Sequence, residues 1–96
     1  MKLDSVQPAT NNKNKYTATF LQDSGRTKTT HFGAKGMDDY TITHDKEQRK
    51  RYRERHAKDL NTNDPTRAGY LSYYLLWGDS TNLQTNIASY KRKFNL

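Results

Sequence analysis

The chain has 96 residues, of which 31% are hydrophobic, and it carries a formal net charge of +7. It contains no cysteine, which excludes disulfides, thiolate metal sites and a cysteine nucleophile. A chain of this length forms one small domain, and the mean hydropathy of −1.23 indicates little apolar material for its core.

Residues 1–14 show no hydrophobic period, and we expect them to form an extended, flexible N-terminal arm. Segments 16–21 and 27–32 are rich in β-branched and aromatic residues, and a turn sequence at 23–26 separates them. This pattern predicts a β-hairpin. Because two strands alone are only marginally stable in water, the hairpin should pack on helices or extend a neighbouring sheet.

Residues 33–36, Gly-Ala-Lys-Gly, should end the second strand in a turn with positive φ at glycine. The same GxxG form clamps nucleic-acid backbone in KH domains, where it joins two helices. Here a strand precedes it, so we interpret it as a turn, with Lys35 as a candidate contact for a phosphate or a carboxylate. Residues 37–43 are expected to form an irregular connector.

Three helices are predicted in the rest of the chain. The first runs over about 45–58 and begins at an N-cap aspartate. The second spans 65–77, with Asp64 as its N-cap, and is apolar on most faces, so it should be the central core helix. The third begins at Thr81 and carries an amphipathic series formed by Leu83, Ile87, Tyr90 and Phe94.

These elements predict an α+β protein. An extended N-terminal arm over 1–14 precedes a single small basic domain over 15–96, which combines the β-hairpin with a three-helix C-terminal part. We find no internal repeat.

Positive charge is densest in the first predicted helix. Glu47 and Arg51 have the spacing of an i, i+4 ion pair, and so do Glu54 and Lys58. Such a helix suits a nucleic-acid backbone, an acidic protein or membrane surface, or plain solvent, and the sequence leaves these alternatives open. The cations that would contact nucleic acid or another acidic partner are Lys46, Arg49, Lys50, Arg53 and Lys58.

The second predicted helix concentrates aromatic side chains on two adjacent faces. Tyrosine and tryptophan are enriched where proteins bind one another. The same rings also suit the core of a small protein, and both roles are compatible. The candidate protein-contact residues are Tyr70, Tyr73, Tyr74 and Trp77.

No catalytic motif or metal-ligand spacing occurs in the sequence. We therefore expect no enzymatic activity, no cofactor, no metal site and no small-molecule substrate. An enzymatic function would require a pocket that brings His31, His44 or His56 next to a carboxylate.

Four blocks of the sequence are distinctive in their order and spacing: FGAKGMDDYT (32–41), HDKEQRKRYRERH (44–56), NDPTRAGYLSYYLLW (63–77) and NIASYKRKFNL (86–96). Together they resemble a family of small basic proteins encoded by large nucleocytoplasmic DNA viruses, such as relatives of chlorella viruses and mimiviruses. The resemblance covers about residues 15–96. Two positions depart from that family's pattern, because Asp45 follows His44 directly and Arg67 replaces a threonine.

The resemblance implies a viral setting and supplies no catalytic residues. It leads us to expect a structural virion protein, a minor capsid or cement-type component of a large icosahedral DNA virus that binds neighbouring shell proteins. The alternative is a virion-packaged protein that binds nucleic acid without sequence specificity. Either protein would be found in the virion, and in the host cytoplasm or nucleus before assembly.

Overall fold

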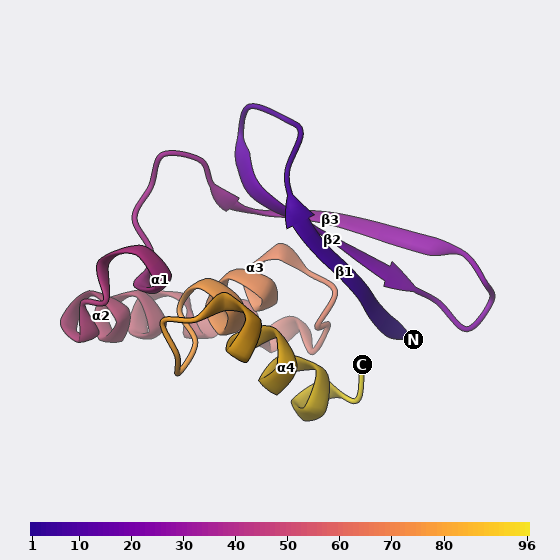
Figure 1. Cartoon of the computed structure of the whole chain (residues 1–96). Helices are drawn as coiled ribbons and strands as arrows, with labels where there is room; N and C mark the ends of the chain where they lie inside the picture. The colour runs from indigo at the N-terminus through magenta and orange to yellow at the C-terminus, as the bar shows by residue number, and fades with distance from the viewer.

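The computed structural model describes residues 1–96 as a three-stranded antiparallel sheet followed by helices (Figure 1). Figure 1 shows the helices on one side of the sheet, and this arrangement confirms the predicted α+β class. In chain order the elements are β1 (Lys2–Pro8), β2 (Asn14–Leu21), β3 (Thr27–Ala34), α1 (Tyr40–Thr43), α2 (Lys46–His56), the 3₁₀-helix η1 (Ala57–Thr62), α3 (Ala68–Leu71), the π-helix η2 (Ser72–Leu76) and α4 (Leu83–Phe94).

The predicted hairpin is formed by β2 and β3. The two strands pair in a continuous register from Asn14 opposite Ala34 to Leu21 opposite Thr27. In the turn, Gly25 has a φ of 87°, which side chains disfavour. Gly36 has a φ of 85° in the turn after β3, which confirms a glycine-dependent turn there. The turn begins later than predicted, because β3 continues to Ala34 and includes Gly33, which also has a positive φ.

The N-terminal segment is extended, as predicted, but it is not the flexible arm that its composition alone suggested. Residues 2–8 form β1, which pairs with β2 and makes β2 the central strand. The hairpin leaves one edge of β2 for this pairing, and Leu3, opposite Phe20 in the pair, becomes buried. The backbone N–H of Leu3 also donates to the carbonyl of Leu96 at 3.2 Å, so the two ends of the chain meet.

The connector at 37–43 is more regular than expected, because it contains the one-turn helix α1. Asp39 begins this turn, and its carboxylate accepts the backbone N–H of Thr41 at 2.8 Å. α2 follows after Asp45, which accepts the N–H groups of Glu47 and Gln48. The predicted N-cap of this helix is therefore confirmed.

The other two helices begin later than predicted. The carboxylate of Asp64 accepts both the N–H and the hydroxyl of Thr66, which makes a turn there. The second predicted helix, which consists of α3 followed directly by η2, therefore starts at Ala68. The third helix begins at Leu83, because the side chain of Asn82 caps it in place of Thr81.

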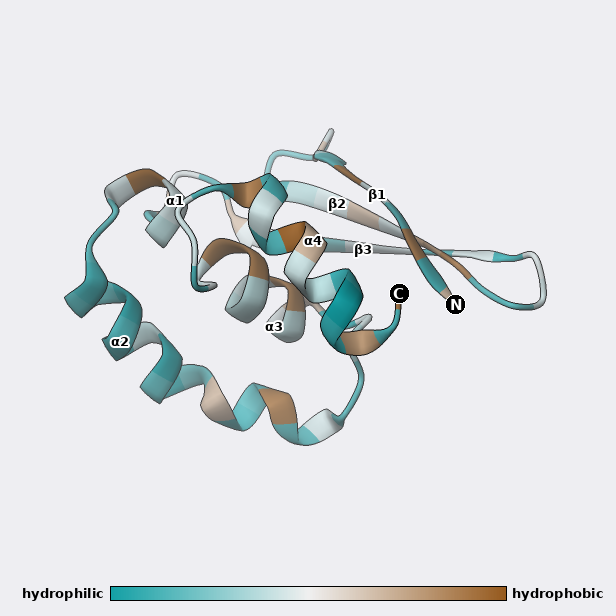
Figure 2. Cartoon of the chain, turned by 60° about the horizontal axis from the view of Figure 1, so that its bottom comes forward, coloured by the Kyte–Doolittle hydropathy of each residue, from teal (hydrophilic) through white to brown (hydrophobic).

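The core lies between the sheet and the second helix. Phe20 and Phe32 of the sheet are almost fully buried, and so are Leu71 and Leu75 of α3 and η2. Tyr90 of α4 also belongs to the core, where it packs against Tyr74 of η2, and it is 1% exposed. The prediction that the second helix is central is therefore confirmed. Figure 2 shows hydrophobic positions on both α3 and α4, whereas α2 is mostly hydrophilic. None of the helices combines the length and apolar character that crossing a bilayer requires.

Candidate functional site

The cations of α2 divide between two sides of the helix. At about 100° per residue, positions 48, 49, 52, 53 and 56 share the side that faces the other helices. These residues are all partly buried, whereas the remaining charged residues of α2 are exposed. We call the two sides the inner face and the outer face of α2.

Arg49 and Arg53 lie on the inner face and bind the end of η2. The Nε of Arg49 donates to the carbonyls of Trp77 at 3.2 Å and Gly78 at 2.7 Å. Nη1 of Arg53 donates to the carbonyls of Tyr73 at 3.3 Å and Trp77 at 2.8 Å. Two of the residues predicted to contact nucleic acid therefore bind backbone carbonyls within the protein.

The end of η2 needs these donors for two reasons. The N–H of Trp77 bonds to the carbonyl of Ser72, in the π pattern, so the carbonyl of Tyr73 lacks its usual helical partner. This helix also has no basic residue of its own in its last turn, where its dipole favours a cation. Arg49 and Arg53 supply both the donors and the positive charge from α2.

Further contacts hold both arginines in place. Arg49 pairs with Asp79 at 2.6 Å, and its guanidinium lies 5.6 Å from the centre of the Tyr40 ring. Arg53 lies 4.1 Å from the centre of the Tyr73 ring. A β-carbon at Gly78 would lie 2.2 Å from the carbonyl oxygen of Tyr74, so only glycine permits this chain path beside α2.

The aromatic candidates are mostly interior. Tyr70, Tyr73 and Trp77 are each less than 10% exposed, which leaves Tyr74 as the accessible ring of the four. Burial raises the pKa of Tyr74 and that of Tyr90. Two cations lie near the ring of Tyr74, with Arg53 at 5.8 Å and Lys93 of α4 at 5.7 Å from its centre.

The outer face of α2 carries charges of both signs. Glu47 and Glu54 are seven residues apart, about two helical turns, so they form a line along the middle of this face. Neither makes the ion pair predicted for it, with Arg51 or Lys58. The exposed cations of this region are Lys46, Lys50, Arg51, Arg55 and Lys58, and Lys35 is exposed in the turn after β3.

One histidine lies beside a carboxylate. Nδ1 of His56 is 3.0 Å from Oδ2 of Asp59, and the His56 ring stacks on Tyr52 at a centroid distance of 4.1 Å. His31 instead contacts the hydroxyl of Thr17, and His44 ends α1 with a left-handed backbone. No three potential ligands are grouped to hold a metal ion.

Sequence reasoning missed the buried ion pair of Lys15 and Asp39. Nζ of Lys15 lies 2.5 Å from Oδ2 of Asp39, and the aspartate side chain is 2% exposed. The other carboxylate oxygen accepts two hydrogen bonds from Thr41. The pair thereby links the start of α1 to β2. The two residues are 24 positions apart, and no local pattern in the sequence predicts that they pair.

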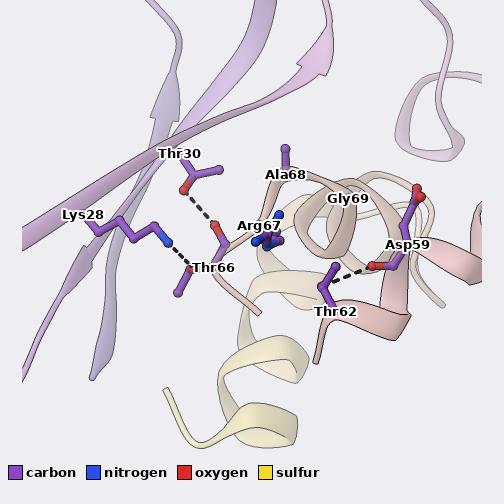
Figure 3. Close-up of a pocket in the computed structure, with 8 residues that line it drawn as sticks. All are labelled: Lys28, Thr30, Asp59, Thr62, Thr66, Arg67, Ala68 and Gly69. Atoms are coloured by element: carbon purple, nitrogen blue, oxygen red, sulfur yellow. Dashed lines mark hydrogen bonds between the residues drawn. The ribbon is translucent and has the colours of Figure 1, made fainter. Parts of the chain in front are cut away.

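A polar pocket of about 590 Å³ lies between β3 and the start of α3 (Figure 3). In it, Nζ of Lys28 donates to the hydroxyl of Thr66, and the hydroxyl of Thr30 donates to the Thr66 carbonyl. These side chains are already paired with one another, so they join β3 to the α3 turn and leave few free groups for a ligand.

A second pocket, of about 510 Å³, opens between α2 and the 33–39 segment. Tyr52, Arg55 and His56 line it from α2, and Trp77 lines it from the end of η2. Burial raises the pKa of Tyr52. We call this cavity the α2 pocket.

Comparison with known proteins gives a family and no activity. The model of a family of unknown function, DUF5754, matches residues 5–56. The chain belongs to this family. The match covers the sheet, α1 and α2, including eleven of the fourteen residues that line the α2 pocket. No curated protein and no solved structure matches the chain.

Proposed function

We propose that this protein is a structural component of a virus particle, of the minor capsid or cement type, which binds neighbouring shell proteins through the outer face of α2. The viral setting rests on the sequence resemblance described above. The observation that supports a protein partner is the line formed by Glu47 and Glu54 between the exposed cations.

This line matters because a phosphate backbone carries only negative charge. Two carboxylates in the middle of the contact would face phosphates and weaken binding. Folded protein surfaces carry both signs, so they offer cations to Glu47 and Glu54 and carboxylates to Lys50 and Arg51. The internal engagement of Arg49 and Arg53 further reduces what α2 offers to nucleic acid.

The second candidate is packaged nucleic-acid binding, which the net charge of +7 and the basic last turn of α4 favour. Titration of the purified protein into a short labelled DNA duplex, from low to physiological salt, separates the two. Five phosphate contacts would give a slope of log affinity against log salt of about −4.5. Under our proposal, binding is weak even at low salt and lacks this slope.

A pair of variants sharpens this test. Glu47→Gln with Glu54→Gln adds two units of positive charge at α2, and Asp4→Asn with Asp23→Asn adds the same charge elsewhere on the exposed surface. If α2 binds DNA, the first pair strengthens binding more than the second. Equal, small effects are expected for a structural protein.

The location of the protein in a particle tests the proposal directly. Gentle disruption and sedimentation of virus particles should leave the protein with the shell fraction. Its recovery with the genome would overturn the proposal in favour of the second candidate.

A further inference from the structure

The α2 pocket has the size and the walls of a binding site. Its volume of about 510 Å³ lies within the range of about 300–1,000 Å³ typical of ligand pockets. One wall is the 33–39 segment and another is a face of α2. The third wall comes from η2 and Trp77, so three parts of the chain converge on one cavity.

The interior of the pocket suits an aliphatic side chain better than a flat ring. Tyr52 stacks on Trp77 at 4.3 Å with an interplanar angle of 8°, and His56 stacks on the other side of Tyr52. Both faces of Tyr52 are therefore covered, so a nucleobase has no space to stack on this ring. Met37 lies in the same lining and is 63% exposed, which gives the pocket an adaptable apolar edge.

On the α2 side of the pocket, the charge that has no ion-pair partner is the positive charge of Arg55. Asp39 is neutralised by Lys15 and by its hydrogen bonds to Thr41, so it does not repel an anion. Arg55 is exposed and makes no ion pair. Asp38, on the opposite wall, is the exposed carboxylate that opposes it.

We propose that the α2 pocket binds an acidic peptide segment of a partner protein, with an aliphatic side chain in the cavity and a neighbouring carboxylate on Arg55. This inference rests on the proposed function, because it gives the protein partner a specific point of attachment. Charge complementarity favours a carboxylate at the α2 wall, where Arg55 is an exposed cation without an ion pair, and the aliphatic side chain lies away from Asp38 on the opposite wall.

The single tryptophan of the chain reports on this pocket. We would titrate the protein with an acetylated peptide that contains leucine between two glutamates, and follow the fluorescence of Trp77. Saturable binding is expected, and it should weaken when glutamine replaces the glutamates or alanine replaces the leucine. No saturable change at millimolar peptide would overturn the inference, and so would tighter binding of adenosine monophosphate.

Two matched variants test the role of Arg55. Arg55→Gln should weaken peptide binding about fivefold, whereas Arg26→Gln removes the same charge from the exposed turn after β2, outside the pocket, and should change it less than about twofold. Asp38→Asn should strengthen binding, because it removes the opposing carboxylate. Equal weakening by the two arginine variants would show attraction by net charge alone and overturn the inference.

Failure of this inference is distinguishable from failure of the proposed function. If the peptide does not bind while the protein still sediments with the shell, only the pocket assignment is lost. If the protein follows the genome, the proposed function is lost whatever the peptide does.

Discussion

The inner and outer faces of α2 both carry cations, but the two faces use them in different ways. On the inner face, Arg49 and Arg53 bind backbone carbonyls at the end of η2 and lie against tyrosine rings. On the outer face, Lys50 and Arg51 are exposed and make no ion pair. A count of positive charge along a helix therefore does not measure the charge available to a partner.

The difference follows from helical geometry and from the needs of the neighbouring helix. Residues 49 and 53 are one turn apart, so they reach successive carbonyls of the same helix end. Because that end lacks its own basic residues, the inner arginines act as its cap. The inner arginines therefore stabilise the fold, whereas the outer cations remain exposed.

The largest expected effect concerns Lys15, a largely buried cation on β2. Lys15→Met should lower the free energy of unfolding by about 3–5 kcal/mol, because it leaves the buried carboxylate of Asp39 without its partner. Urea denaturation measures this change. Lys13→Met is the control, since that lysine is exposed, and adding Asp39→Asn should restore part of the loss. A loss below 1 kcal/mol would show that the pair contributes little.

The next effect compares the two faces of α2 directly. Arg53→Met should lower the free energy of unfolding by about 2–4 kcal/mol, because it removes charged hydrogen bonds to the Tyr73 and Trp77 carbonyls and the contact with the Tyr73 ring. Lys50→Met, the same type of change on the outer face, should alter it by less than about 0.5 kcal/mol. Similar losses for the two variants in thermal denaturation would contradict the division between the faces.

A smaller effect concerns pH and the rings that pack between η2 and α4. Burial raises the pKa of Tyr90 in the folded chain, whereas the unfolded chain ionises this group near pH 10. The contribution of the neutral phenol to the free energy of unfolding is therefore fully present below about pH 10. It decreases as the pH rises from there through the folded pKa.

The variant Tyr90→Phe should show a weaker fall in stability between about pH 9 and pH 11 than the parent chain. At neutral pH it should be less stable by about 1 kcal/mol, because it loses the hydrogen bond from the phenol to the carbonyl of Pro65. Urea midpoints measured across this range provide the test, and parallel curves for the two proteins would count against it.

The smallest effect is expected on the outer face itself. Arg51→Gln and Lys46→Gln should each change the free energy of unfolding by less than about 0.5 kcal/mol, since both side chains are exposed and unpaired. Chemical denaturation at low and high salt checks this result. A loss above 1 kcal/mol would mean that the outer face also supports the fold.

Local signals in the sequence predicted much of the fold. Alternation and turn residues located the β2–β3 hairpin, and Asp45 located the start of α2. The N-terminal strand was missed because its residues gain order from the edge of β2, which composition does not describe. The start of the second helix was misplaced because Asp64 caps a turn at Thr66 before the helix begins.

The candidate site was less accessible to sequence reasoning. Five cations of the basic segment were identified, but which side each one faces depends on the position of η2, almost thirty residues later. One signal in the sequence was usable, because the last turn of η2 contains no basic residue. The carbonyl groups at such a helix end need hydrogen-bond donors from another part of the chain. The α2 pocket joins three distant segments, and no local pattern announces it.

The meeting of the chain ends also decides where this protein tolerates additions. The hydrogen bond between Leu3 and Leu96 places both termini at one end of the molecule, and Figure 1 shows α2 extending toward the opposite end. A fusion at either terminus would therefore leave the outer face of α2 and its pocket uncovered. A short linker between the two ends would even allow the chain to be circularly permuted, with new termini opened at an exposed turn such as 23–26.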